Sequence, residues 1–178
     1  MKLFNVLTLA FSLMMLVLIA SCTETTSVAG EAELVSESEI MTTPGFKEWY
    51  QTDLDAYSPD PAVINDIKTV FDADNHKFVL FASSCGYCVG DQNDFAVMMK
   101  IIHEAGIPES NYQLYSIVKA TYKQPYESRF TLNFLPSCFI LKDEEAVYSV
   151  ADTMIYMKYK FPDAVPTYEQ LFLSGLLK

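Results

Sequence analysis

Two cysteines separated by two residues are the part of this 178-residue sequence most suited to chemistry. Cys85 and Cys88 enclose Gly86 and Tyr87 in a Cys-x-x-Cys motif. Two thiols at this spacing can close a disulfide with each other and exchange it with another protein. The same spacing also supplies half of a four-ligand zinc site.

Few other side chains in the sequence could complete a zinc site. Apart from Cys22 near the N-terminus, thiol or imidazole ligands are otherwise offered only by Cys138, His76 and His103, and no second Cys-x-x-Cys motif is present. We therefore favour thiol–disulfide exchange and expect no metal. A structural disulfide without redox activity remains the other interpretation of the pair.

The motif follows a predicted strand and precedes a predicted helix. Residues 76–82 form a short, unbroken apolar run, which is typical of a fully buried central strand. After the motif, Phe95, Met98 and Ile102 recur at helical spacing, and Gly106 marks the end of that helix.

This placement gives the two thiols different roles. A free cysteine, with a pKa of about 8.5, is mostly protonated at neutral pH. Unpaired N–H groups and the dipole at a helix N-terminus stabilise the thiolate and lower that pKa. We expect Cys85 to be the exposed nucleophile and Cys88, about one turn later, to be the resolving thiol.

The rest of the folded region supplies further elements, with no internal repeat. The predicted elements are a helix over 61–71 that begins after Asp60, a strand over 112–118, a further helix before Pro136, a hairpin over 138–150 with a charged turn at 142–145, and an amphipathic helix over 167–178. Residues 152–166 are interpreted as a long loop. Its Tyr156, Tyr159 and Phe161 either line a partner surface or pack inward.

This order of elements resembles the thioredoxin superfamily over residues 60–178. Three features carry the resemblance: the motif between a buried strand and a helix, Pro136 directly before a hairpin, and the closing amphipathic helix. The Cys-Gly-Tyr-Cys tetrapeptide is also similar to that of bacterial periplasmic disulfide isomerases. The resemblance implies an α/β fold, a thioredoxin-like three-layer α/β/α sandwich with a mixed central sheet of four to five strands.

The resemblance also implies a substrate site and no organic cofactor. In the family, the proline that matches Pro136 follows a cis peptide bond and packs against the disulfide, and its neighbour receives an extended substrate. Leu135, Gly86 and Tyr87 are the expected substrate-binding residues. The sequence departs from thioredoxin at Val79, where thioredoxin carries a buried acid that helps to move the proton of the resolving thiol.

Cys138 lies two residues after Pro136, on the same face of a strand. It is interpreted as a buried core cysteine. The alternatives are a third redox partner or a metal ligand.

The N-terminus predicts export from the cytoplasm. Residues 1–21 combine one Lys with a long apolar run and a small-residue end, as in a secretory signal; a retained transmembrane anchor is the alternative. The sequence Ile-Ala-Ser before Cys22 resembles the bacterial lipoprotein processing box, which implies cleavage and lipidation at Cys22. Thr23, where an Asp would favour the inner membrane, favours an outer-membrane location in the cell envelope or periplasm.

Composition sets the limits of the remaining regions. Residues 22–39 are rich in Ser, Thr and Glu without an apolar face, so we expect a lipidated flexible tether. Residues 40–178 are expected to form the thioredoxin-like domain with an N-terminal helical extension. The formal net charge of −11 argues against nucleic-acid binding.

Together these patterns predict a lipid-anchored thiol–disulfide oxidoreductase. Its expected partners are cysteine-containing exported proteins, a thiol-redox protein of the envelope, and the membrane through the N-terminal lipid. A redox-inert binding module with a structural disulfide is the alternative, and a reductase that serves metallo-cofactor assembly is a third.

Overall fold

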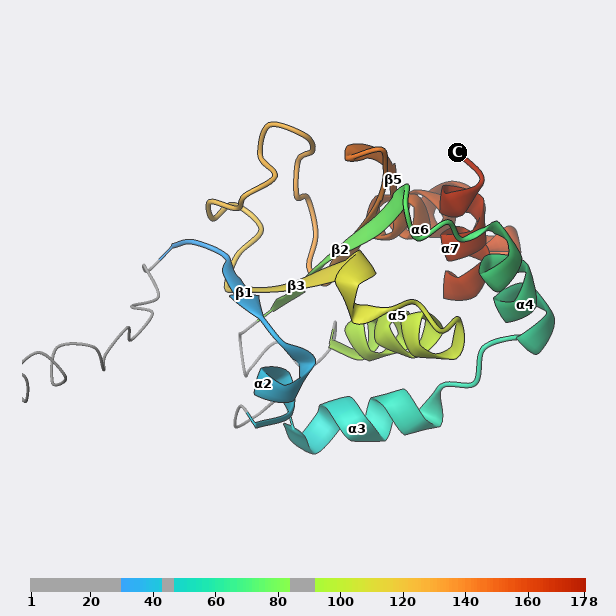
Figure 1. Ribbon diagram of the computed structural model, residues 1–178, viewed down its shortest axis with the longest axis horizontal. Coiled ribbons are helices and arrows are strands. Elements are labelled where there is room, and N and C mark those ends of the chain that lie inside the picture. The colour runs from blue at the N-terminus through green and yellow to red at the C-terminus, as the bar shows by residue number, and fades with distance from the viewer. Residues whose placement is uncertain (1–29, 43–46, 84–91) are drawn as a thin grey trace, which may run out of the picture.

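A mixed five-stranded sheet forms the centre of the structure, a computed structural model that describes residues 30–42, 47–83 and 92–178 (Figure 1). The strands are β1 (Glu33–Val35), β2 (His76–Ser83), β3 (Tyr112–Ile117), β4 (Ser137–Lys142) and β5 (Glu145–Ser149). The α-helices among the described residues are α2 (Glu37–Thr42), α3 (Lys47–Ala56), α4 (Pro61–Val70), α5 (Gln92–Glu104), α6 (Val150–Lys160) and α7 (Tyr168–Leu176). Short 3₁₀ helices are η1 (Glu109–Asn111) and η2 (Pro162–Ala164). The predicted α/β class and mixed sheet are confirmed.

Strand β2 lies in the middle of the sheet. The strand order is β1-β3-β2-β4-β5, and β2 is parallel to β3 and antiparallel to β4. Every residue of β2 except Lys77 is buried. A strand covered on both faces needs apolar residues at consecutive positions, so the apolar run of the sequence correctly predicted a buried central strand.

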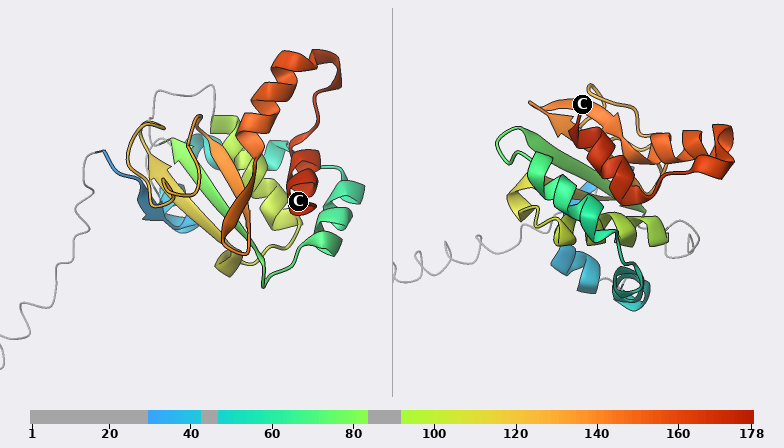
Figure 2. Two further views of the ribbon diagram at one scale, coloured as in Figure 1. Left: turned by 90° about the horizontal axis from the view of Figure 1, so that it is seen from above. Right: turned by 90° about the vertical axis from the view of Figure 1, so that its right-hand side faces the viewer.

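One face of the sheet packs against helices (Figure 2). Phe78 and Leu80 of β2 belong to the same buried cluster as the apolar residues of α4, α5 and α7. Helix α3 packs on the outside of α5 (Figure 1). Helix α4 begins as predicted, because Pro61 is its first residue and the side chain of Asp60 accepts a hydrogen bond from the backbone N–H of Ala62 at 2.8 Å.

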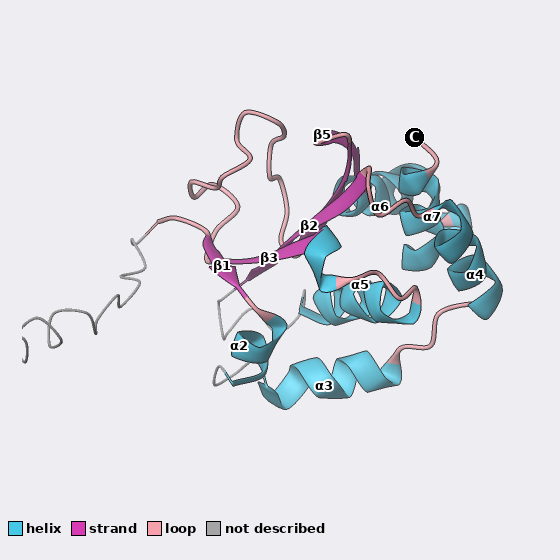
Figure 3. Ribbon diagram, viewed as in Figure 1, coloured by secondary structure: helices cyan, strands magenta, loops and turns pink. Residues whose placement is uncertain are grey.

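The other face is covered by the connection between β3 and β4, residues 118–136, which crosses it as loops and turns (Figure 3). The helix predicted before Pro136 is therefore wrong, and residues 118–136 cover this face without forming a helix. Aromatic packing takes its place. The ring of Phe130 stacks on Tyr126, with ring centroids 5.5 Å apart, and on Phe139 of β4 at 3.7 Å.

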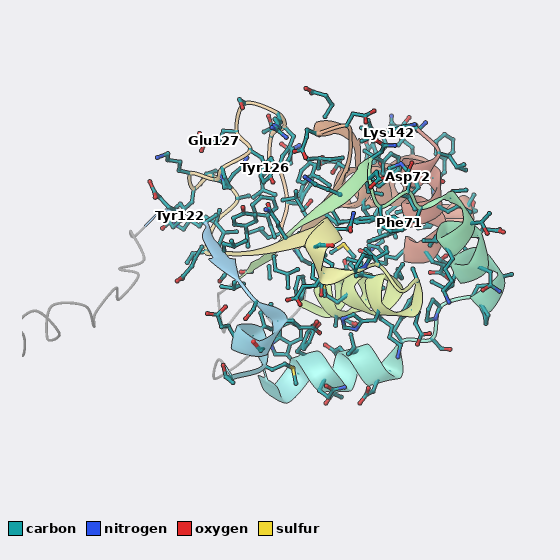
Figure 4. All side chains as sticks on the ribbon, in the orientation of Figure 1. Phe71, Asp72, Tyr122, Tyr126, Glu127 and Lys142 are labelled. Atoms are coloured by element: carbon teal, nitrogen blue, oxygen red, sulfur yellow. The ribbon has the colours of Figure 1, made fainter. Side chains whose placement is uncertain are left out.

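Polar contacts hold the same connection to the sheet. Arg129 donates to the backbone carbonyl of Glu144 at 2.6 Å and to its carboxylate at 3.1 Å. The hydroxyl of Tyr126 donates to the side chain of Gln113 in β3 at 2.6 Å. Figure 4 shows Tyr122, Tyr126 and Glu127 projecting from this connection. Contacts with distant strands therefore determine the conformation of this connection, and local helix propensity does not.

The ordered fold begins before residue 40. Strand β1 pairs antiparallel with β3, with Leu34 opposite Tyr115, and α2 follows it directly. The flexible tether expected over residues 22–39 is therefore wrong for the strand and the start of the helix, and residues 22–29 lie outside the described residues. A three-residue strand is too short for its alternation to be recognised in the sequence.

Helix α2 is fixed to the body through Glu37. Its carboxylate accepts from the hydroxyl of the buried Tyr50 in α3 at 2.7 Å and lies 3.0 Å from Nε2 of His103 in α5. Burial opposes ionisation of Glu37, but the hydrogen bonds with His103 and Tyr50 outweigh it and hold its pKa below the ordinary value.

Helix α6 corrects the loop expected over residues 152–166. Ser149 caps it by accepting from the backbone N–H of Asp152 at 3.3 Å, and the helix continues to Lys160. Tyr156, Tyr159 and Phe161 are 54%, 79% and 50% exposed. The interpretation that these aromatics pack inward is therefore wrong.

The end of the sheet where β2 begins is closed by hydrogen bonds. Nδ1 of the buried His76 accepts from the backbone N–H of Asp72 at 3.0 Å, and Asn111 donates to the carbonyl of His76 at 3.0 Å. Figure 4 shows Phe71, Asp72 and Lys142 gathered at this end. Burial, and secondly the charge of Lys142, lower the pKa of His76.

Candidate functional site

The structure describes the two elements that flank the Cys-x-x-Cys motif but not the motif itself. Strand β2 ends at Ser83 and the described part of α5 begins at Gln92, so the motif belongs to the connection between them. The predicted site residues that lie outside the described residues are Cys22, Cys85, Gly86, Tyr87 and Cys88.

Pro136 lies beside the end of β2. Phe81 of β2 is paired with Ser137, the first residue of β4, and Pro136 immediately precedes Ser137. The peptide bond between Leu135 and Pro136 is cis, as the resemblance implied. Pro136 is buried and Leu135 is half-buried. The sheet register therefore brings the predicted proline next to the strand that leads into the motif.

A surface pocket with a volume of about 210 Å³ adjoins Pro136, and we call it the Pro136 pocket. One wall is the segment 134–136, and the facing wall is α6, which contributes Met154, Ile155 and Lys158. Asp94, in the first turn of α5, also lines the pocket. Small-molecule sites usually occupy about 300–1,000 Å³, so this volume suits one or two side chains of a peptide better than a cofactor.

The α6 wall is the part of the site that was missed in the sequence. Ala151, Met154, Ile155 and Lys158 recur at i, i+3, i+4 and i+7, which is the spacing of one helix face. That pattern is present in the sequence, but it was not recognised because residues 152–166 were interpreted as a loop. Lysines in the last turn, Lys158 and Lys160, were a second signal of a helix C-terminus.

Strand β2 carries no acidic side chain, and position 79 is occupied by valine. The residue is 1% exposed and belongs to the buried cluster that includes Phe81 and Phe139. The buried polar side chains at the adjacent ends of β2 and β4 are the hydroxyls of Ser83 and Ser137.

Cys138 is an inert core residue. Its side chain is fully buried in the cluster on the helix-covered face, and its nearest polar contact is the backbone carbonyl of Phe139, at 4.0 Å from the sulfur. Burial raises the pKa of the Cys138 thiol far above its ordinary value. A thiol that stays protonated is neither a nucleophile nor a good metal ligand, which supports the interpretation as a core cysteine.

In the ranges that the structure describes, no three His, Cys, Asp or Glu side chains gather closely enough to hold a metal ion. None of the helices in these ranges combines the length and the apolar character needed to cross a membrane.

Comparison with known proteins gives no relative. No protein-family model, no curated protein and no solved structure matches the chain significantly. A function must therefore be supported by the chain's own residues and geometry.

Proposed function

We propose that the protein is a thioredoxin-like thiol–disulfide oxidoreductase that acts on exported proteins. The observation that carries the proposal is the position of Pro136. The register of β2 and β4 sets it beside the strand end that leads directly to Cys85 and Cys88. Pro136 and an open pocket thus lie at the end of the sheet from which the chain continues, two residues after Ser83, to Cys85.

The order of elements supports the thioredoxin-like fold. A buried strand, the motif and a helix follow one another as β2, residues 85–88 and α5. Pro136 precedes the β4–β5 hairpin, and the chain closes with α7, whose Leu171, Phe172 and Leu176 are buried. These are the three features on which the resemblance depends. The irregular connection 118–136 and the added helix α6 are departures from it.

The proposed reaction is a two-step exchange that conserves thiols and electrons. The thiolate of Cys85 attacks a substrate disulfide, forming a mixed disulfide and releasing one substrate thiolate, which takes up a proton. Cys88, once deprotonated, attacks the sulfur of Cys85, which closes the Cys85–Cys88 disulfide and releases the second substrate thiol. The substrate gains two electrons and the pair loses two, and a second thiol protein restores the pair. The reverse sequence oxidises a substrate dithiol.

The inert character of Cys138 supports a two-thiol mechanism. It is the one thiol outside the motif and the proposed lipidation site, and its burial keeps it protonated. Resolution of the mixed disulfide is therefore assigned to Cys88 alone.

We further propose that the chain is exported and anchored by lipid at Cys22, on the outer membrane of the envelope. The signal-like residues 1–21 and the small residues before Cys22 support this location. An oxidising compartment is also where a Cys-x-x-Cys pair finds disulfide substrates.

A redox-inert binding module is the second candidate, and Val79 favours it. With valine instead of an acid at position 79, proton transfer to and from Cys88 has no assigned base, and a slow pair would behave as a structural disulfide. In that case the Pro136 pocket would bind a peptide without turnover.

The deciding experiment measures the reduction potential of the pair in the purified full chain. The protein is equilibrated with glutathione buffers, and free thiols are trapped and counted by mass. A potential above about −200 mV would assign an oxidant or isomerase, and one near −270 mV a reductase. Cys85→Ser should abolish exchange, whereas Cys138→Ser is the matched control and should leave the rate unchanged. A pair that resists reduction, or exchanges no faster than a buried disulfide, would leave only the binding module.

A further inference from the structure

Helix α6 forms one wall of the Pro136 pocket, and its side chains offer a basis for selecting substrates that the Cys-x-x-Cys motif alone does not provide. We propose that α6 selects the substrate, by accepting an extended peptide segment in which an apolar side chain is followed by an acidic one. The inference rests on the proposed function, because it names the substrates that reach the motif. It concerns residues that are all within the described part of the chain.

The apolar half of this specificity comes from the pocket itself. Met154 is buried at its base, and Ile155 and Phe134, from opposite walls, remain 40% and 42% exposed. Two apolar side chains facing a pocket of about 210 Å³ leave room for an apolar side chain of a substrate. Burying one such side chain is the main attraction that a pocket of this size offers.

The charged half comes from Lys158. Its side chain lines the same pocket and makes no ion pair or hydrogen bond with another described residue. The protein as a whole carries a net charge of −11, so Lys158 places a positive charge at this pocket of a predominantly acidic chain. An acidic residue beside the apolar side chain of the substrate would complement it.

Asp94 determines on which side of the pocket an acidic residue of the substrate is favoured. It lines the pocket from α5, the helix that follows the motif, whereas Lys158 lies on the α6 wall. A substrate residue near α5 meets a negative charge and one near α6 meets a positive charge. Acidic residues are therefore favoured on the side of the pocket that α6 forms.

The outer face of α6 supplies a matched control. Lys160 lies two residues after Lys158, does not line the pocket, and stacks over the exposed ring of Tyr159, with its Nζ 5.2 Å from the ring centroid. Lys158→Glu and Lys160→Glu change the net charge equally, but only the first changes the pocket. Figure 2 shows α6 and η2 extending away from the body of the protein, so both positions are reached by solvent.

The test uses two disulfide-containing peptides of equal length that differ only in one residue. Each carries a leucine next to the reacting cysteine, followed by Glu in one peptide and Lys in the other. The reduced full chain should reduce the Glu peptide about threefold to tenfold faster, since an exposed charge pair contributes modestly. Lys158→Glu should reverse the preference, Lys160→Glu should keep it, and the rate with glutathione disulfide should not change in either variant.

The outcomes separate this inference from the proposed function. Exchange without a preference, or a preference altered equally by both lysine variants, overturns the inference and leaves the oxidoreductase. If no disulfide is exchanged, the oxidoreductase fails, and binding of serine-substituted peptides to the full chain then decides the inference. A Lys158-dependent preference in that binding supports it, and equal binding overturns it. A dimer in sedimentation that Lys158→Glu dissociates would assign the pocket to a second copy and also overturn it.

Discussion

The hydrogen bond between Tyr57 and Glu169 is expected to stabilise the packing of α7 strongly. The Tyr57 hydroxyl, just after α3, donates to the Glu169 carboxylate at 2.5 Å, and the backbone N–H of Asp60 donates to the same group at 3.2 Å. Glu169 is only 3% exposed. Tyr57→Phe removes one donor from a buried charge while keeping the ring. A hydrogen bond to a charged group is worth about 1.5–3 kcal/mol, and we expect that loss at pH 7.

The loss should depend on pH in a defined direction. Burial opposes ionisation of Glu169, but the hydrogen bonds from Tyr57 and from backbone groups outweigh it, so its folded pKa lies below the ordinary 4.5. A carboxyl with a lowered folded pKa stabilises the fold fully above its unfolded pKa, and this contribution disappears as the pH falls through the folded pKa. The effect of Tyr57→Phe should therefore be largest at pH 7 and shrink below about pH 4, to the roughly 0.5–1.5 kcal/mol of a neutral hydrogen bond.

Urea unfolding at pH 7 and pH 3.5, followed by circular dichroism, measures both effects. At pH 7 the expected loss corresponds to a decrease in Tm of about 3–12 °C for a chain of this size. Tyr159→Phe is the matched control, because Tyr159 is 79% exposed, and it should change stability by less than about 0.5 kcal/mol. Equal losses for the two variants, or a Tyr57→Phe loss that grows as the pH falls, would refute the reasoning.

Three further substitutions test the packing around the sheet. The lowered folded pKa of His76 means that the unfolded chain binds more protons than the folded one below about pH 6.5, so stability falls from pH 7 to pH 5. His76→Gln should make this fall in stability smaller. An unchanged pH profile in urea titrations would contradict the reasoning. Asn111→Ala removes two hydrogen bonds from a buried amide and should cost about 2–3 kcal/mol in the same assay; a loss below about 0.5 kcal/mol would show that the turn before β2 needs no such support. Gly175→Ala would set a Cβ 2.4 Å from Cδ1 of Ile140 and should cost about 1–3 kcal/mol, whereas the exposed Ser174→Ala should not; a stabilised Gly175→Ala would mean that the core yields.

The sequence was sufficient for the elements whose patterns are local and long. The unbroken apolar run of β2, the cap at Asp60 and the hairpin after Pro136 each carried their own signal, and each is found. The elements that were missed depend on distant partners. Strand β1 exists because β3 offers it an edge, and the connection 118–136 is shaped by aromatic stacking on Phe139. No local propensity encodes such contacts.

The sequence offered a prediction for the chemistry of the candidate site but none for its walls. The spacing of Cys85 and Cys88 predicts thiol exchange, the resemblance adds Pro136, and the sheet register sets Pro136 beside the end of β2. The facing wall comes from α6, which was expected to be a loop. Its pocket-lining residues recur at the spacing of one helix face, but Ile155, Tyr156 and Tyr159 remain exposed, so its apolar residues are only weakly segregated.

The structure differs between the two ends of β2, and this difference supports the proposal of a functional site at one of them. At the end where the strand begins, Asn111 and the turn that contains Asp72 make hydrogen bonds around His76. At the end where the strand leaves the sheet, the register sets Pro136 beside an open pocket with both apolar and charged lining residues. In α/β sheets, ligands bind outside the carboxyl ends of the central strands, because the loops there are not needed to close the core. Two buried polar side chains, His76 and Asn111, make these hydrogen bonds at the first end, whereas the second end lies beside a pocket and continues in the sequence towards Cys85.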